Sequence, residues 1–140
     1  MDEMDQHEKR ASTSDMWQGD EASRSAGMSL DEVSQGHSVI SMTVRADMVN
    51  GLDVCHGGYL FMLADSAMAF ASNTADAPAV AAAAQIDFVA PAHLGDRLVA
   101  RATTQWTGGR NALHDVEVRN QAGQLVARFH GRTSRVSPPR

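Results

Sequence analysis

The most regular feature of the sequence is a series of short segments in which apolar and polar residues alternate. Residues 39–44 alternate between apolar and hydroxyl side chains, which predicts a half-buried strand. Residues 28–33 precede it across a Gln35-Gly36 turn and would pair with it. Four more strands are expected further along the chain, at residues 79–90, 97–106, 111–119 and 124–136.

Between the second and third predicted strands the pattern changes to an almost unbroken apolar run. Residues 57–73 are apolar on nearly every side, with Asp65 as the only charged residue and Asn73 at the end. This predicts a long helix that is buried all round. One curved sheet covers a single side of such a helix, so a second surface is needed, and a two-fold dimer is the simplest source.

The two ends of the chain set the limits of the predicted domain. Residues 1–13 show no apolar period and are expected to be disordered, and the proline-containing tail of residues 137–140 cannot pair in a sheet. A short helix over residues 14–26 would begin a single domain that spans residues 14–136. The fold class is therefore α+β, with one long central helix wrapped by an antiparallel sheet of five to six strands.

The alternation also assigns faces to the later strands. Trp106 is predicted to lie on the inner face together with Leu98, whereas Arg128, His130 and Arg132 are predicted to point outward.

Composition narrows the class of protein without identifying an activity. The chain has 140 residues, 43% hydrophobic and 21% charged, which is typical of a soluble globular domain. A formal net charge of -5 argues against nucleic acid as the main partner. The single cysteine, Cys55, excludes an internal disulfide. With a charged N-terminus and no apolar run of about 20 residues, a cytoplasmic protein that does not bind membranes is expected.

Candidate chemistry is concentrated around the predicted long helix. A lone carboxylate in an apolar helix is costly to bury, so Asp65 is either paired structurally or used chemically. Gly57 would place an unobstructed N–H at the helix N-terminus, where the helix dipole favours negative charge. Asn50 could donate a side-chain amide or serve as a turn residue. His56 could orient other groups or be structural, and Cys55 is interpreted as packing.

The order and spacing of these residues resemble a known family. The residues that carry the resemblance are Asn50-x4-Cys55-His56-Gly57-Gly58-x3-Met62-Leu63-Ala64-Asp65-Ser66-Ala67 and, later, Ile86-Asp87-Phe88-x2-Pro91-Ala92-x2-Gly95-Asp96. Over residues 36–135 the chain resembles the hotdog-fold acyl-CoA thioesterases, in particular their phenylacetic acid degradation (PaaI/PaaD-like) branch. The resemblance implies a hotdog fold and hydrolysis of an aryl or arylacetyl CoA thioester, such as hydroxyphenylacetyl-CoA.

The resemblance also implies roles for the catalytic candidates. Asp65 would act as general base or nucleophile, Gly57 N–H would polarise the thioester carbonyl, Asn50 would be a second donor, and His56 would orient. Eight residues of helix separate Gly57 from Asp65 by about 12 Å, too far for one carbonyl. Two antiparallel helices across a dimer axis would bring Asp65 of one chain to Gly57 of the other. The expected assembly is a homodimer, and further a dimer of dimers (a homotetramer).

Further residues are expected to contact the substrate. The candidates for this role are Gly58, Tyr59, Leu60, Ser66, Gln85 and Arg110. Tyr59 and Leu60, with Met62 and Leu63, would line the acyl pocket. Related thioesterases often carry a hydroxyl on the strand after the helix; here that stretch has alanines, so any such role is absent or passes to Gln85. Arg110, Arg128 and Arg132 could meet the phosphates of coenzyme A, or simply be solvated.

Two other functions compete with hydrolysis. A non-catalytic acyl-CoA binding or sensing protein could use the same fold, although it would not need a buried carboxylate at Asp65. A dehydratase that uses His56 as base is the other candidate, but the proline-rich surroundings usual for it are missing. No metal-ligand spacing and no dinucleotide or phosphate-loop motif is present, so no metal and no cofactor are expected; coenzyme A would be part of the substrate.

Overall fold

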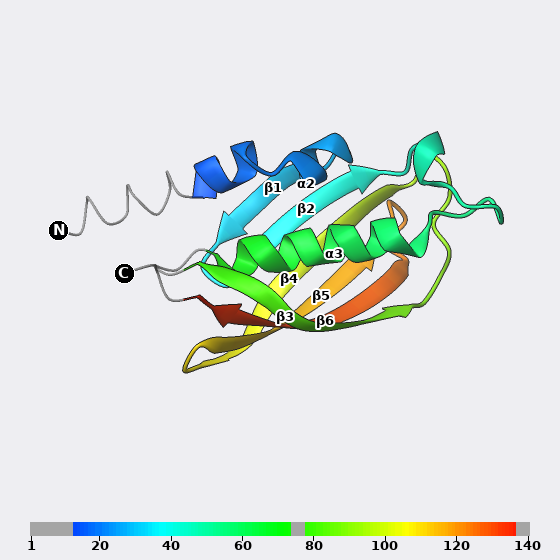
Figure 1. The fold of residues 1–140 in the computed structure, drawn as a ribbon. Helices are drawn as coiled ribbons and strands as arrows, with labels where there is room; N and C mark the ends of the chain where they lie inside the picture. The colour runs from blue at the N-terminus through cyan, green and yellow to red at the C-terminus, as the bar shows by residue number, and fades with distance from the viewer. Residues whose placement is uncertain (1–12, 74–77, 137–140) are drawn as a thin grey trace.

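A long helix lies across one face of a six-stranded antiparallel sheet (Figure 1). The computed structural model describes residues 13–73 and 78–136. The elements are α2 (Glu21–Ser25), β1 (Ser29–Ser34), β2 (His37–Thr43), the 3₁₀ turn η1 (Ala46–Met48), α3 (Gly57–Ser72), β3 (Ala79–Phe88), β4 (Arg97–Gly108), β5 (Asn111–Arg119) and β6 (Leu125–Arg135). The α+β class, the long helix and six strands are thus confirmed. The expectations for residues 1–12 and 137–140 lie outside the described residues.

Helix α3 is the centre of the core. Nine of its sixteen residues are buried, and the helix packs chiefly against β2 and β4 and also against β5, β6 and β3, as its apolar pattern predicts. Asn73 ends the helix as expected: its side-chain amide donates to Ala69 O at 2.8 Å and to Ala79 O at 3.0 Å, and its Oδ1 accepts from Ala79 N. The end of α3 is therefore tied to the start of β3.

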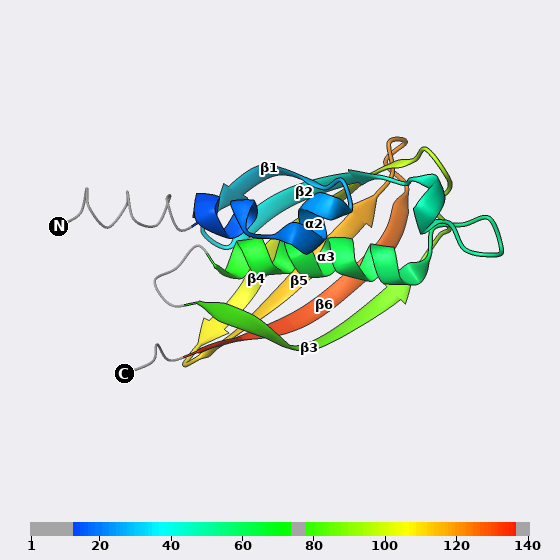
Figure 2. The ribbon, with the colours of Figure 1, turned by 45° about the horizontal axis from the view of Figure 1, so that its top comes forward.

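The N-terminal segment forms two short helices rather than the single helix predicted over residues 14–26. Residues 13–18 are helical, Gly19 ends that helix, and α2 begins after Asp20. Asp20 breaks the run because its side chain accepts a hydrogen bond from Ser23 N and so caps a new helix. Both short helices lie over α3 (Figure 2). Trp17 meets Phe70 edge-on at 5.4 Å, so part of the cover that α3 needs comes from its own chain.

One stripe of α3 is left half-covered. Met62, Asp65 and Ala69 are neither fully buried nor fully exposed, and they recur at the spacing of a single helix face. Strand β3 runs alongside α3 at the edge of the sheet and pairs only with β6 (Figure 2). Residues 81–85 of β3 are all exposed. The protomer thus presents an unpaired strand edge beside a half-covered helix stripe.

Trp106 corrects one prediction about the sheet. The pairing of β4 with β5 passes from Thr104↔His114 to Trp106↔Leu113, which leaves Gln105 as the extra residue of a β-bulge. The bulge turns Trp106 to the outer face, where it is 53% exposed, while Leu98 is buried as predicted. The outward positions of the last strand, Arg128, His130 and Arg132, are confirmed.

Candidate active site

The loop before α3 is held by its own hydrogen bonds. Asn50 Oδ1 accepts from Leu52 N at 2.9 Å and from Val54 N at 3.3 Å, which is the role of a turn residue. Because these two donors fix the side-chain oxygen, they also fix the direction of the Asn50 amide NH₂. Within the described part of the chain this NH₂ has no hydrogen-bond partner. Asn50 therefore shapes the loop and keeps a free donor.

His56 caps α3 and decides which of the two glycine N–H groups is free. Its Nδ1 accepts from Gly58 N at 2.8 Å, so the neutral ring carries its proton on Nε2. The next N–H, that of Tyr59, donates to His56 O. Gly57 N–H has no partner among residues 13–73 and 78–136. The helix N-terminus therefore offers one unpaired donor, at Gly57, and the helix dipole strengthens it.

An apolar cavity of about 410 Å³ opens beside this donor. It is lined by Asn50, Val54, Cys55, Gly57, Leu60 and the segment 88–92. A Cβ added to Gly57 would lie 3.0 Å from Cζ of Phe88, so only glycine fits here without moving that ring. The structure therefore brings together Asn50, Gly57 and Leu60 from the predicted set, and Phe88 is a lining residue that sequence reasoning missed.

Asp65 lies two turns further along α3, on the half-covered stripe. Burial raises the pKa of its carboxyl above the ordinary value. The carboxylate makes no hydrogen bond or ion pair with the described residues. A structural role as half of an ion pair is therefore not seen within the protomer. Cys55 is different: it is buried, and burial raises the pKa of its thiol to about 11, which fits packing rather than nucleophilic chemistry.

The remaining predicted residues do not gather around Gly57 within one chain. Ser66 is buried, and its Oγ lies 2.8 Å from Ser23 Oγ, so its hydroxyl joins α3 to α2. Tyr59 packs partly against the core, and Gly58 is exposed. Gln85 lies on the exposed middle of β3. Arg110 lies in the β4–β5 turn.

Arg110 lies near the C-terminal end of α3. Its carbonyl accepts from Arg135 N at 2.7 Å. Arg135 in turn pairs with Ala79, which Asn73 holds at the end of α3. The β4–β5 turn is accordingly at the opposite end of the helix from Gly57 (Figure 1).

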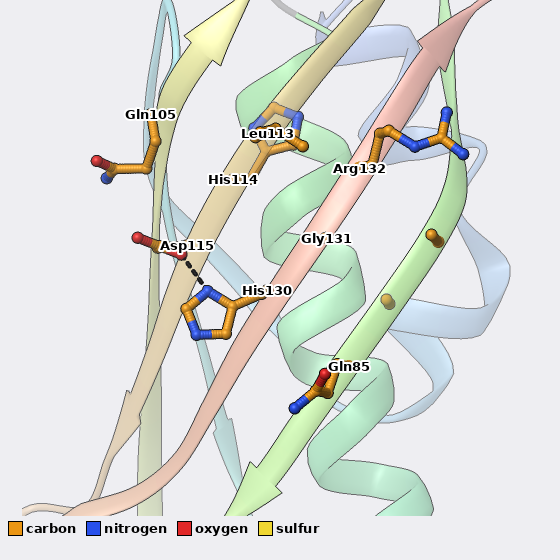
Figure 3. Close-up of a pocket in the computed structure, with 10 residues that line it drawn as sticks. Gln85, Gln105, Leu113, His114, Asp115, His130, Gly131 and Arg132 are labelled. Atoms are coloured by element: carbon orange, nitrogen blue, oxygen red, sulfur yellow. Dashed lines mark hydrogen bonds and ion pairs between the residues drawn. The ribbon is translucent and has the colours of Figure 1, made fainter.

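A second hollow, of about 600 Å³, lies on the outer face of the sheet (Figure 3). It contains more ionisable groups than the cavity beside Gly57, but each of them is already hydrogen-bonded to another side chain. His130 Nδ1 contacts the Asp115 carboxylate, and Arg132 donates to Asn111 Oδ1 at 2.9 Å. Sequence reasoning did not find the His130–Asp115 pair. A turn at residues 120–123 alone would set 115 opposite 128; the register shift between Val118 and Arg119 sets Asp115 opposite His130 instead, so the turn residues do not signal the pair.

Below this hollow, His114 is buried and bonded on both ring nitrogens, to Thr104 Oγ1 at 2.9 Å and to Thr133 Oγ1 at 2.8 Å. Burial and, secondarily, the charge of Arg135 lower its pKa. No cluster of three His, Cys, Asp or Glu side chains suited to a metal occurs in the described ranges. No helix among the residues that the structure describes is long and apolar enough to cross a membrane.

Comparisons with known proteins show the family to which the chain belongs. Residues 52–127 match the model of the family described as "Thioesterase superfamily". The chain is 40% identical over 121 residues to acyl-coenzyme A thioesterase PaaI of Escherichia coli, with 86% of each chain covered. The structure of the E. coli PaaI protein from the phenylacetic acid degradation operon matches with a TM-score of 0.90 at 37% identity, over 94% of this chain and 95% of that one. A Streptococcus mutans protein bound to acetyl CoA matches with a TM-score of 0.76 at 25% identity, over 81% and 91% of the two chains.

Proposed function

This chain belongs to the thioesterase superfamily of hotdog-fold proteins and is an acyl-CoA thioesterase, and we propose that its substrates are aryl or arylacetyl thioesters of coenzyme A. The observation that carries the proposal is the unpaired N–H of Gly57, a residue that lines an apolar cavity at the start of α3. Hydroxyphenylacetyl-CoA represents the expected class. The likeness to a protein of a phenylacetic acid degradation operon supports this choice of acyl group.

Two groups of the protein carry out the proposed reaction, the Gly57 N–H and the Asp65 carboxylate. The thioester carbonyl oxygen accepts a hydrogen bond from Gly57 N–H, and the dipole of α3 stabilises the negative charge that develops there. Asp65 removes a proton from a water molecule as the water oxygen bonds to the carbonyl carbon. The C–S bond then breaks, coenzyme A leaves as the thiolate, and that thiolate takes up a proton. In the alternative course, the Asp65 carboxylate attacks the carbonyl carbon and the C–S bond breaks, so coenzyme A leaves as the thiolate. Water then hydrolyses the mixed anhydride, which releases the acid and restores the Asp65 carboxylate.

These two groups come from different protomers in the proposed site. Along α3 they lie about 12 Å apart, which is too far for one carbonyl. Two α3 helices that pack antiparallel through their half-covered stripes would place Asp65 beside the partner's Gly57. The exposed edge of β3, which runs next to that stripe, supports such an assembly because an unpaired edge is suited to pairing with another strand. The proposed unit is a homodimer with two equivalent sites, with two such dimers forming a dimer of dimers.

The same antiparallel arrangement would bring Arg110 and Gln85, which do not line the cavity beside Gly57 within one protomer, close to the partner's cavity. The C-terminal end of one α3 would lie near the N-terminal end of the partner helix. Arg110, near that C-terminal end, would then approach the partner's cavity and could bind a phosphate of coenzyme A. Gln85, on the exposed edge strand, would contact substrate or water, with Asn50 as second donor and His56 holding Gly58. The proposed reaction uses water and protein groups, with coenzyme A as part of the substrate.

The acyl-pocket roles of Tyr59 and Leu60 and the substrate contact of Gly58 remain proposals. The role of Leu60 is supported because it lines the apolar cavity beside Gly57. A substrate contact by Ser66 would require its hydroxyl to leave Ser23. A cytoplasmic location stays a prediction from the sequence.

A complementation experiment tests the composite site. Asp65→Ala chains and Gly57→Val chains are each expected to be inactive in a thiol-release assay. Purified heterodimers that carry two different affinity tags should recover about half of the native activity, because one of their two sites is intact. Verified heterodimers that stay inactive would refute the shared site. Wild-type protein that binds CoA ligands but releases no thiol from any thioester would instead favour the non-catalytic acyl-CoA binding or sensing protein.

A further inference from the structure

Phe88 is the part of the cavity beside Gly57 that the proposed mechanism does not use. It is the last residue of β3, and its side chain is 56% exposed although it is a large aromatic residue. Three atoms at the tip of its ring, Cζ, Cε1 and Cε2, lie 3.0, 3.2 and 3.6 Å from where a Cβ on Gly57 would be. The ring therefore covers the Cα side of the residue whose N–H faces the substrate.

The backbone around Phe88 is held by hydrogen bonds, whereas its ring borders the cavity and solvent. Phe88 pairs with Ala127 of β6, and both Val89 N and Ala90 N donate to Val126 O, at 2.8 and 3.2 Å. Within the described ranges, the Phe88 ring makes no aromatic pair; the two that occur are Trp17–Phe70 and Phe61–Phe129. One side of the ring tip meets Gly57, and the rest faces the cavity and solvent. An incoming group can therefore pack against this ring at a fixed place.

The distances match an acyl group held by Gly57. A carbonyl oxygen about 2.9 Å from Gly57 N, with a C=O bond of about 1.2 Å, places the acyl carbon about 4 Å from that nitrogen. The Phe88 ring tip lies against the same residue, 3.0 Å from where a Cβ on Gly57 would be. Because Gly57 and Phe88 line the same cavity, an acyl substituent that enters this cavity meets the Phe88 ring. An aryl group there gains an edge-to-face or offset ring contact, which a linear acyl chain does not.

We propose that Phe88 is a specificity-determining residue of this thioesterase, which forms the aromatic wall of the acyl pocket beside Gly57 and favours aryl over linear acyl groups. The inference rests on the proposed function, since it assumes that Gly57 N–H holds the thioester carbonyl. Contact with an aryl acyl group also buries apolar surface of Phe88 that is otherwise exposed to water. Removal of the ring should therefore change the preference between substrates more than it changes the fold.

The test compares two substrates across matched variants. We expect Phe88→Ala and Phe88→Leu to lower the ratio of kcat/KM for phenylacetyl-CoA to that for hexanoyl-CoA by about tenfold, and Phe88→Tyr to keep it. Leu94→Ala is the control, because Leu94 is another exposed large apolar residue after β3 but does not line the cavity. Its ratio should stay within about twofold of the wild-type ratio.

The outcomes separate this inference from the proposed function. If wild-type protein releases no thiol from either substrate, the proposed function fails. If wild-type protein hydrolyses phenylacetyl-CoA but the ratio is unchanged in Phe88→Ala, only the role of Phe88 is overturned. If Phe88→Ala loses activity equally on both substrates and light scattering shows a changed oligomeric state, Phe88 is an interface residue, and its role in specificity is again refuted.

Discussion

The cavity at the start of α3 and the hollow on the outer face of the sheet differ in how their polar groups are used. The outer hollow is larger and holds His130, Asp115 and Arg132, but these groups are paired with one another or with Asn111. The cavity is smaller and almost apolar, and its main polar feature is a backbone N–H without a partner. Along the same helix, Asp65 also has no partner in the described residues.

If the proposed site is correct, the difference teaches that an unsatisfied group is a better sign of a reaction site than a high number of polar groups. Paired side chains have already exchanged their bonds to water for bonds to each other, so they hold the sheet together. A donor fixed at a helix N-terminus beside an apolar cavity can stabilise a developing charge without reorganising. Four experiments test this difference between the two regions.

The largest effect is expected from Asp65→Asn. An amide cannot take a proton from water, so kcat should fall by about 10²- to 10⁴-fold in a thiol-release assay. The thermal unfolding midpoint should hold or rise, because a neutral side chain removes the cost of burying charge at this position. The matched control is Asp115→Asn in the outer hollow, which should leave kcat within about twofold. Equal losses of kcat in the two variants would contradict the assignment of the catalytic base to Asp65.

Gly57→Ala should follow, with a loss of about tenfold to a hundredfold in kcat/KM. The added methyl group would lie 3.0 Å from the Phe88 ring, so the ring or the helix N-terminus has to shift. With hexanoyl-CoA, whose hydrolysis should not depend on the Phe88 ring, the double variant Gly57→Ala/Phe88→Leu should recover part of the loss, since it removes the close contact. Gly51→Ala is the control, because a Cβ there meets nothing within 4 Å. No difference between the alanine variants at 51 and 57 would argue against a close fit at the cavity.

The pH profile gives a smaller and more specific signal. A base must be deprotonated to act, and burial raises the pKa of Asp65. The rate should therefore fall with decreasing pH at a midpoint above the ordinary aspartate value of about 3.9. Initial rates from pH 4 to 8, on protein shown to stay folded across that range, measure this midpoint. An acid limb that is unchanged in the residual activity of Asp65→Asn would assign the titration to another group.

The smallest effect concerns stability near the outer hollow. Because the pKa of His114 is lowered in the folded state, the unfolded chain binds its proton more readily. This contribution favours unfolding increasingly as the pH falls below the ordinary histidine value of about 6.5, and the thermal midpoint should drop by a few degrees between pH 7.5 and 5.5. His130→Gln, on the exposed side, should keep this drop. His114→Gln should reduce it, and an unchanged slope in that variant would contradict the assignment.

The sequence predicts the elements well because their patterns are local. The change from alternation to an all-round apolar run marks α3 to within a residue, and the turn residues mark the hairpins. Trp106 was assigned to the wrong face because a β-bulge shifts the phase without changing residue types. The break before Asp20 was missed because a helix cap competes with an otherwise continuous helical segment.

The site was only partly predictable for a related reason. His56 caps α3 by accepting a hydrogen bond from Gly58 N, two residues along the chain, and Gly57 lies between them, so a local motif can show both residues. The contact of Ser66 with Ser23 joins residues 43 apart, and no local pattern indicates it. The closeness of Phe88 to Gly57 likewise depends on how β3 runs back along α3.

The position of α3 in the chain has a consequence for protein synthesis. The helix ends at Ser72, but β6, which supplies part of its packing surface, begins only at Leu125. At about 5–20 residues per second, the ribosome needs several seconds to make the intervening chain. During that interval the nascent protein carries an apolar helix that still lacks part of its packing surface, including β6. The surface that later becomes the core is then a target for chaperones and for aggregation, and slower synthesis lengthens the exposure.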